Sequence, residues 1–100
     1  MTDFIAELET ILHSRRTNPT AGSYTAQLLA QGEDEIVKKI GEEAVEIILA
    51  AKGQGDERLV EEMADLVYHL LVLLVSRDLS WEAVVAELRG RHRQVPRKEN

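Results

Sequence analysis

Two stretches of the chain decide its fold: DEIVKKIGEEAVEIILAAK at 34–52 and ERLVEEMADLVYHLLVLLVSR at 57–77. Each is about 20 residues long, enough for about 30 Å of α-helix, and strong helix formers dominate both. The loop that joins them, Gly53-Gln54-Gly55, is short. Because a short loop makes consecutive helices run side by side in opposite directions, we expect an antiparallel helical hairpin and an all-α fold.

Shorter helices are expected on both sides of the hairpin, each starting at a polar cap. They lie at about 3–15 after Thr2 or Asp3, at 24–30 after Ser23, and from 81 onwards after Ser80. Gly32 is expected to end the second of these helices. The last is expected to fray near Gly90, and the tail from Val95 is expected to be disordered.

Length and composition narrow the class of protein. One hundred residues predict a single domain over 1–100. The formal net charge of -6 disfavours nucleic acid as a partner, and no apolar run approaches the roughly 20 residues of a membrane span. The N-terminus lacks the basic and apolar regions of a signal peptide, and there is no cysteine. We therefore expect a cytoplasmic protein without a nucleic-acid or membrane partner.

Apolar residues nearly surround both hairpin helices. They are Val37, Val45, Ile48 and Leu49 in the first helix and Val67, Leu70, Leu71, Leu74 and Val75 in the second. A helix that is apolar on more than one face must be buried on more than one face. We expect a homodimer in which two hairpins complete a helical bundle.

Acidic residues lie within these apolar stripes. At 100° per residue, Glu43 falls about 20° from Ile36, and Glu62 lies equally close to the apolar centre of its own helix. Glu46 and Asp65 each follow three residues later, on the edge of the stripe. A single Glu-x-x-Glu pair usually marks a solvated face, but two pairs on the buried sides of one hairpin would repel each other and need a cation. Pure oxygen ligation favours Mg²⁺ first and Mn²⁺ second, so the sequence predicts a magnesium site.

These residues resemble the signature of the all-α nucleotide pyrophosphohydrolases, the MazG-like superfamily. Three segments carry a closer resemblance: Gly22-Ser23-Tyr24-Thr25, Lys39-Ile40-Gly41-Glu42-Glu43, and Glu61-Glu62 with Asp65-Leu66 and Tyr68-His69-Leu70. Over roughly 4–93 the chain is similar to the phosphoribosyl-ATP pyrophosphohydrolase family. The resemblance implies Mg²⁺-dependent hydrolysis of phosphoribosyl-ATP to phosphoribosyl-AMP and pyrophosphate, the second step of histidine biosynthesis, by a cytoplasmic homodimer. With no cysteine and no metal-binding histidine cluster, the chain looks like the stand-alone form, without the cyclohydrolase that many bacteria fuse to it.

The resemblance also implies roles for the acidic residues. The implied metal ligands are Glu43, Glu46, Glu62 and Asp65. Glu42 is either a further ligand or the base that orients the attacking water. Metal ions that bridge the phosphates would neutralise developing charge and lower the pKa of bound water.

Several basic and hydroxyl residues are candidates for binding the substrate. They are Lys39, Arg15, Ser23, Tyr24, Thr25, Arg91 and His92. These residues also have simpler interpretations. Lys39 could form an ion pair with Glu43, and Arg15, like its neighbour Arg16, could interact favourably with the helix dipole. Ser23, Tyr24 and Thr25 could simply start a helix, and Arg91 and His92 could lie at a solvated helix end. His69 is expected to bond a ligand carboxylate or to be a satisfied core histidine.

Three alternatives to this function stay open. A house-cleaning pyrophosphohydrolase of noncanonical nucleoside triphosphates would share the metal site, and the Gly-Ser-Tyr-Thr segment argues against it. A di-iron carboxylate bundle would need Glu-x-x-His on its ligand helices. A non-enzymatic dimerisation module would explain the apolar faces of the hairpin, but not the acids within them.

Overall fold

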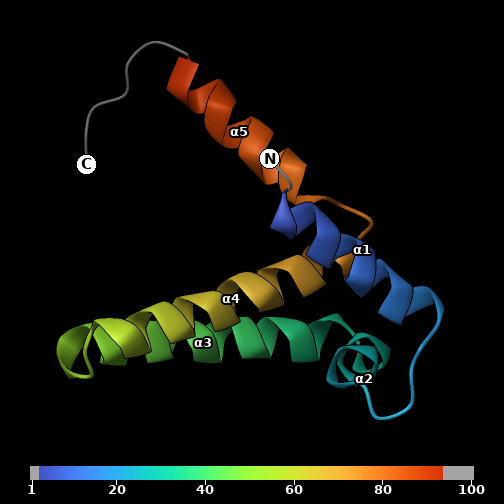
Figure 1. The fold of residues 1–100 in the computed structure, drawn as a ribbon, viewed down its shortest axis with the longest axis horizontal. Helices are drawn as coiled ribbons and strands as arrows, with labels where there is room; N and C mark the ends of the chain where they lie inside the picture. The colour runs from blue at the N-terminus through green and yellow to red at the C-terminus, as the bar shows by residue number, and fades with distance from the viewer. Residues whose placement is uncertain (1–2, 94–100) are drawn as a thin grey trace.

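The computed structural model describes residues 3–93, which form helices and the turns between them, without strands. The five helices in this part of the chain are α1 (Phe4–Thr17), α2 (Tyr24–Gln31), α3 (Glu33–Gly53), α4 (Asp56–Ser76) and α5 (Trp81–Arg93). In Figure 1, α3 and α4 lie side by side as a long antiparallel hairpin, α1 crosses one end of it, and α5 points away from it. The predicted all-α fold is confirmed.

Polar side chains start the short helices, as the sequence predicts. Asp3 accepts a hydrogen bond from the backbone at the start of α1, Ser23 does the same for α2, and Ser80 for α5. Gly32 separates α2 from α3 with a φ of 102°, a left-handed value that favours glycine. Thr2, the alternative cap for α1, lies outside the described residues.

The last helix is longer than predicted. α5 continues through Gly90 to Arg93, so the expected fraying near Gly90 is wrong. Arg91 pairs with Glu87 at 3.0 Å one turn earlier, an interaction that offsets part of the low helix propensity of the glycine. The predicted disordered tail from Val95 lies outside the described residues.

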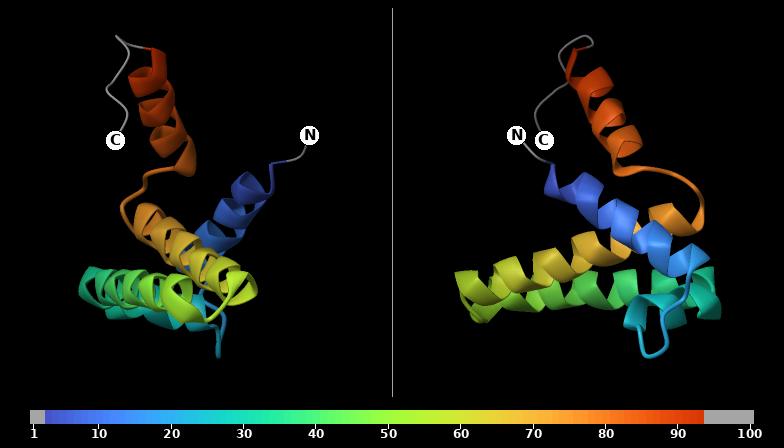
Figure 2. Two further views of the ribbon diagram at one scale, coloured as in Figure 1. Left: turned by 90° about the vertical axis from the view of Figure 1, so that its left-hand side faces the viewer. Right: turned by 45° about the vertical axis from the view of Figure 1, so that its right-hand side comes forward.

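The hydrophobic core lies at one end of the hairpin, where α1 and α2 pack against it. Its fully buried side chains come from α1, α2, the start of α3 and the end of α4: Leu12, Leu28, Ile36, Leu71, Val72 and Val75. Figure 2 shows that the other end of the hairpin, at the turn between α3 and α4, extends beyond the remaining helices. The core therefore anchors one end of the two long helices and sets their register.

Polar contacts reinforce this anchored end. Arg77, just after α4, donates two hydrogen bonds of 2.7 Å to the carboxylate of Glu33 at the start of α3. Arg16 near the end of α1 contacts Asp78 at 2.6 Å and donates to the Val75 carbonyl at 2.8 Å. That carbonyl belongs to the last turn of α4 and also accepts from the backbone N–H of Asp78 at 3.1 Å. Together these bonds hold α1 and α3 against the C-terminal end of α4.

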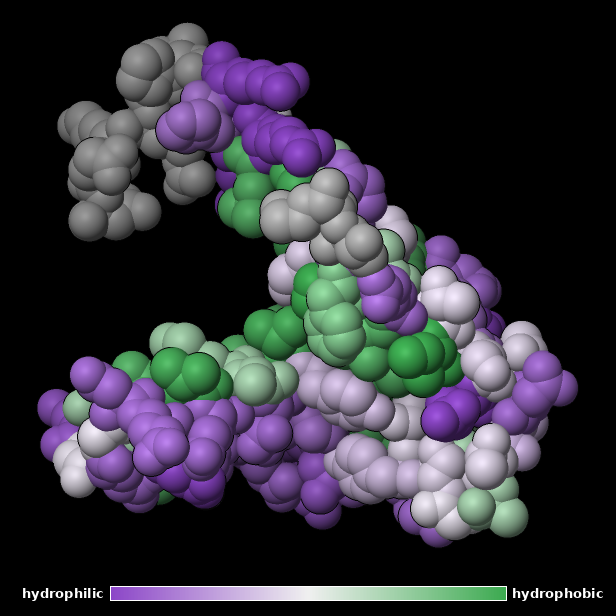
Figure 3. Space-filling model, in the orientation of Figure 1, coloured by the Kyte–Doolittle hydropathy of each residue, from purple (hydrophilic) through white to green (hydrophobic). Residues whose placement is uncertain are grey.

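Many apolar side chains lie on the surface of the single chain. Large exposed ones are Val37, Val45, Ile48 and Leu49 of α3, Val60 and Met63 of α4, and Leu88 of α5. Figure 3 shows apolar surface along the hairpin and in the angle between the hairpin and α5. Exposed apolar patches mark interaction surfaces. The predicted dimer would cover the apolar surface of the hairpin. No described helix is both long and apolar enough to cross a membrane.

Candidate metal centre

Three acidic side chains converge midway along the hairpin. Glu43 of α3 and Glu62 and Asp65 of α4 each offer a carboxylate oxygen, and these oxygens lie within 4.8 Å of one another. Glu62 is only 2% exposed, the Glu43 side chain is 16% exposed, and Asp65 is open to solvent. The cluster is thus buried at Glu62 and open to solvent at Asp65, so a ligand could reach it from the side of Asp65.

Glu43 carries the clearest sign of electrostatic strain. Burial raises the pKa of its carboxyl above the ordinary value, and the nearby charges of Asp65 and Glu62 raise it further, while His69 and Lys39 act in the opposite direction. Its Oε1 atom is buried and accepts no hydrogen bond. A buried carboxylate oxygen without a partner is destabilising, and it is the kind of atom that a divalent cation would satisfy.

His69 lies between the acidic cluster and α2. Its Nδ1 donates to the backbone carbonyl of Asp65 at 2.9 Å and passes 2.6 Å from Glu43 Oε1, a close contact whose direction is wrong for a hydrogen bond. With the proton on Nδ1, Nε2 of the neutral ring accepts from the Tyr24 hydroxyl at 2.7 Å. The Tyr24 and His69 rings also meet edge to face, with centroids 5.8 Å apart. Both ring nitrogens of buried His69 are thus hydrogen-bonded, which fits the second of its two expected roles, that of a satisfied core histidine, and its contact with Glu43 is close but not a hydrogen bond.

The three hydroxyl candidates at the start of α2 have different surroundings. Ser23 uses its Oγ to cap the helix, at 3.1 Å from the backbone nitrogen of Ala26. Thr25 is buried and bonds the hydroxyl of Tyr68. Tyr24 is about half exposed, and burial raises its pKa, as do the charge of Glu43 and of other nearby groups. Of these three side chains, Tyr24 is the one directed to the acidic cluster through His69.

The other candidates on α3 border the cluster. Lys39 pairs loosely with Glu42, at 3.8 Å between Nζ and Oε1, rather than with Glu43 as the simpler interpretation supposed. Glu42 is exposed. Glu46 is half-buried, and its carboxylate does not belong to the group whose oxygens lie within 4.8 Å. The structure thus brings together three of the four predicted ligands and leaves Glu46 one turn farther along the helix.

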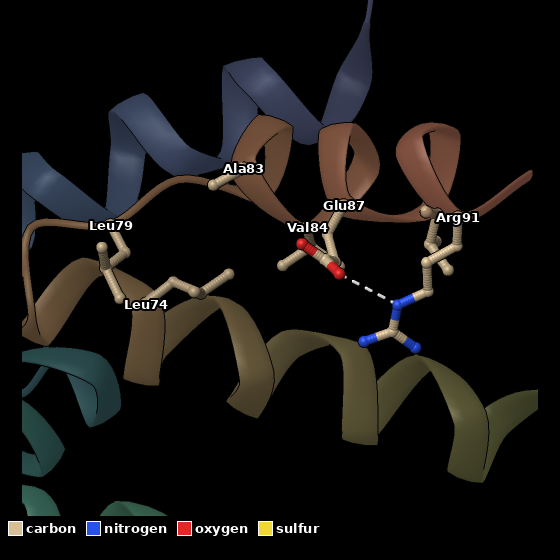
Figure 4. Close-up of a pocket in the computed structure, with 7 residues that line it drawn as sticks. Leu74, Leu79, Ala83, Val84, Glu87 and Arg91 are labelled. Carbon is tan, nitrogen blue, oxygen red and sulfur yellow. Dashed lines mark hydrogen bonds and ion pairs between the residues drawn. The ribbon is translucent and has the colours of Figure 1, made fainter. Parts of the chain in front are cut away.

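The basic candidates outside the hairpin lie elsewhere in the single chain. Arg91 pairs with Glu87 on its own helix and lines an apolar groove between α4 and α5, as Figure 4 shows. His92 lines a neighbouring hollow with Leu88. Because α5 points away from the hairpin (Figure 1), neither side chain belongs to the acidic cluster of the same chain. Arg15, at the end of α1, is half-buried.

Arg58 is a neighbour of the cluster that the sequence analysis missed. Its guanidinium bonds Glu61 at 3.2 Å and contacts the buried carboxylate of Glu62 directly. The available signal was the spacing of four residues to Glu62, which places two side chains on one helix face.

An all-α hairpin that gathers carboxylates from both of its helices defines the class: a helical protein with a candidate divalent-metal centre. Comparison with known proteins narrows this class to one family. The family model of the phosphoribosyl-ATP pyrophosphohydrolases (PRA-PH) matches residues 5–92, and the chain belongs to this family. The resemblance seen in the sequence is confirmed.

Three relatives from different organisms are similar to the chain over 80% or more of their own lengths. The phosphoribosyl-ATP pyrophosphatase of Pelotomaculum thermopropionicum is 54% identical over 92% of this chain and 94% of its own. The protein of the same name from Lactiplantibacillus plantarum is 48% identical over 85% of this chain and 80% of its own. The phosphoribosyl-ATP pyrophosphatase of Metallosphaera sedula is 47% identical over 91% of this chain and 98% of its own.

Proposed function

We propose that this chain hydrolyses phosphoribosyl-ATP to phosphoribosyl-AMP and pyrophosphate, the second step of histidine biosynthesis. Membership in the family supports the reaction. The observation that carries the proposal is the convergence of Glu43, Glu62 and Asp65 from two helices, which brings three carboxylate oxygens within 4.8 Å of one another. Carboxylates at this distance repel one another, and a divalent cation between them would offset that repulsion.

Mg²⁺ is the proposed ion, with Mn²⁺ as the second choice. The donor set fits, since it consists of carboxylate oxygens and includes a buried oxygen that accepts no hydrogen bond. Glu43, Glu62 and Asp65 would hold the ion, and Glu46 would join them from the next turn of α3. When bound, the ion would offset the negative charge of the polyphosphate and lower the pKa of a coordinated water.

Residues around the cluster are proposed to activate the attacking water and to bind the phosphates of the substrate. Glu42 is exposed beside the cluster and is proposed as a further ligand or as the base that orients the attacking water. Lys39 can move from its loose pair with Glu42 to a phosphate oxygen. At the start of α2, the hydroxyls of Ser23, Tyr24 and Thr25 all form hydrogen bonds. Phosphate binding there would therefore use backbone N–H groups, or would need the Tyr24 hydroxyl to leave His69.

We also propose that residues 1–100 form a single domain and that two such chains form a cytoplasmic homodimer. The exposed apolar faces of α3 and α4 support it, because water is a poor environment for so many large apolar side chains. Arg91 and His92 stay candidates for substrate binding only if the dimer places α5 of one chain beside the hairpin of the other. Arg15 would act on the substrate from the end of α1.

The test is pyrophosphate release from phosphoribosyl-ATP, beside ordinary and damaged nucleoside triphosphates, with Mg²⁺ and with EDTA. We expect a strong preference for phosphoribosyl-ATP and no release in EDTA. Glu62→Gln should lower kcat/KM by about 100-fold or more, because the lost interaction is of several kcal/mol. Glu57→Gln, an exposed change on the same helix, is the matched control and should stay active.

Other outcomes would change the proposal in different ways. Cleavage of damaged triphosphates without cleavage of phosphoribosyl-ATP would retain the metal site and replace the substrate with that of a house-cleaning enzyme. Full activity of Glu62→Gln would contradict the metal site itself. No cleavage of any nucleotide with either Mg²⁺ or Mn²⁺ would contradict the hydrolase.

A further inference from the structure

Arg58 reaches from the surface of α4 into the acidic cluster. Its side chain is 48% exposed, while the Glu62 side chain that it contacts is 3% exposed. A hydrogen bond to Glu61 holds the guanidinium in this position. The pKa of Arg58 is raised by the hydrogen bond to Glu61 and by the charge of Glu62, and the more distant charge of Glu46 acts in the same direction. Arg58 therefore remains fully charged beside a buried carboxylate.

This contact supplies the cluster with a positive charge of its own. Within residues 3–93, Arg58 is the one basic side chain that forms an ion pair with Glu62. The neighbouring Glu43 has His69 at 2.6 Å, and Asp65 has no ion pair within these residues. Removing the cation from a buried pair leaves an uncompensated charge and is strongly destabilising. Glu62 can thus be buried without an external cation because Arg58 accompanies it.

We propose that Arg58 is a built-in counter-ion that stabilises the metal-free cluster and weakens its affinity for divalent cations. The inference rests on the proposed function, since it takes Glu62 as a metal ligand. A bound divalent cation and the guanidinium share one carboxylate, so their positive charges repel each other at short range. The protein is therefore stable before it binds metal, and metal binding is correspondingly less tight.

The size of the effect follows from the charges. Arg58 touches a residue of the cluster, so its charge lies within about one Debye length, 8 to 10 Å, of a cation held there. In water, a single and a double positive charge about 6 to 8 Å apart repel by an amount that changes a dissociation constant about five- to tenfold. Replacing Arg58 with an uncharged residue should tighten metal binding by that factor.

Two other roles for Arg58 predict different results. If the guanidinium orients Glu62 as a ligand, its loss would weaken metal binding. If the contact is an ordinary surface ion pair, its loss would leave metal binding unchanged. The direction of the change therefore separates the three roles.

The experiment compares Mn²⁺ binding by the wild-type protein, Arg58→Gln and Arg89→Gln, with free Mn²⁺ measured by electron paramagnetic resonance. Arg89→Gln is the matched control, because it removes the same charge from an exposed pair with Glu82 on α5. We expect Arg58→Gln to bind Mn²⁺ about five- to tenfold more tightly than either other protein. In EDTA we expect it to unfold at a lower temperature than Arg89→Gln.

Each contrary result identifies what has failed. Equal or weaker Mn²⁺ binding by Arg58→Gln, with normal binding by the wild type, overturns the role of Arg58 alone. Equal unfolding temperatures of the two variants in EDTA also overturn it. Absence of Mn²⁺ binding by the wild type contradicts the proposed metal centre, and the role of Arg58 with it.

Discussion

Glu43→Gln is predicted to stabilise the metal-free protein while removing its response to metal. Glutamine has nearly the same shape as glutamate and keeps an oxygen near His69, so the change removes chiefly the negative charge. The carboxylate oxygens of the cluster lie within 4.8 Å of one another. At that distance two unit charges repel by about 1 kcal/mol in bulk water and about 3.5 kcal/mol at an effective dielectric constant of about 20.

The gain in free energy of unfolding should lie between these limits, at about 1 to 3 kcal/mol in EDTA. Glu43 is mostly buried, so screening by water is incomplete, but Asp65 is exposed and its share is smaller. For a chain of this size, 1 kcal/mol corresponds to about 4 to 8 °C in Tm. We therefore expect Tm to rise by at least about 4 °C in EDTA. With excess Mg²⁺ the wild-type protein should gain stability by mass action, and Glu43→Gln should gain much less.

The dependence on pH has a definite sign. Because burial and neighbouring carboxylates raise the pKa of Glu43 above 4.5, the folded protein binds the proton more tightly than the unfolded chain does. The metal-free wild type should thus lose stability as the pH rises from about 4.5 through the raised pKa, and Glu43→Gln should lack this loss.

The assay is thermal unfolding followed by circular dichroism, at equal protein concentration, between pH 4.5 and 8, with EDTA and with Mg²⁺. Glu57→Gln serves as the control for the loss of one negative charge outside the cluster. A Glu43→Gln protein that is less stable than the wild type in EDTA at pH 8 would refute the reasoning, because it would mean that contact with His69 outweighs repulsion from Glu62 and Asp65.

Three further changes test the fold itself. Leu71→Ala removes a side chain with no solvent exposure and should cost about 2 to 5 kcal/mol in urea unfolding; a smaller loss would contradict the close packing of the core. Gly32→Ala should cost about 1 to 3 kcal/mol through backbone strain alone, because φ is 102° and nothing lies within 4 Å of the added carbon; an unchanged urea midpoint would contradict that conformation. Arg16 lowers the pKa of Asp78 by a hydrogen bond, so the stability from this pair is present above pH 3.8 and is lost as the pH falls through the lowered pKa. Asp78→Asn should make stability fall less as the pH is lowered, because asparagine does not titrate, and asparagine tolerates the φ of 57° at this position. An acid-unfolding transition unchanged by the substitution would show that Asp78 does not contribute to the loss of stability in acid.

Local patterns predicted the helices well because the information lies in neighbouring residues. The hairpin followed from two long runs of helix formers around a glycine turn, and the caps at Ser23 and Ser80 followed from their hydroxyls. Gly90 misled the prediction because helix propensity is a weak preference, which the rest of α5 overrides.

The acidic cluster was partly predictable for the same reason. Angular positions on each helix placed Glu43 and Glu62 on buried faces, and both side chains are largely buried. The angles do not give the register between two helices, so they did not separate Asp65, which joins the cluster, from Glu46, which lies farther along. Register depends on the packing at the far end of the hairpin.

Contacts between distant segments were beyond the sequence patterns. The bond between Thr25 and Tyr68 and that between Tyr24 and His69 join α2 to α4 across more than 40 residues. The direction of α5, which carries Arg91 and His92 away from the cluster, depends on the turn after α4, where Asp78 adopts a left-handed conformation. No periodicity in α5 encodes that turn.

The anchored end of the hairpin explains how mutually repelling carboxylates stay together. Free helices would slide or rotate to separate Glu43 from Glu62. Here the buried core and the two-bond pair between Arg77 and Glu33 fix α3 against α4 only a few turns away, so separation would disrupt that packing. A site that is held in place before its ion arrives loses little freedom on binding. The core at one end of the hairpin thus maintains, in its middle, an arrangement that the acids alone would not adopt.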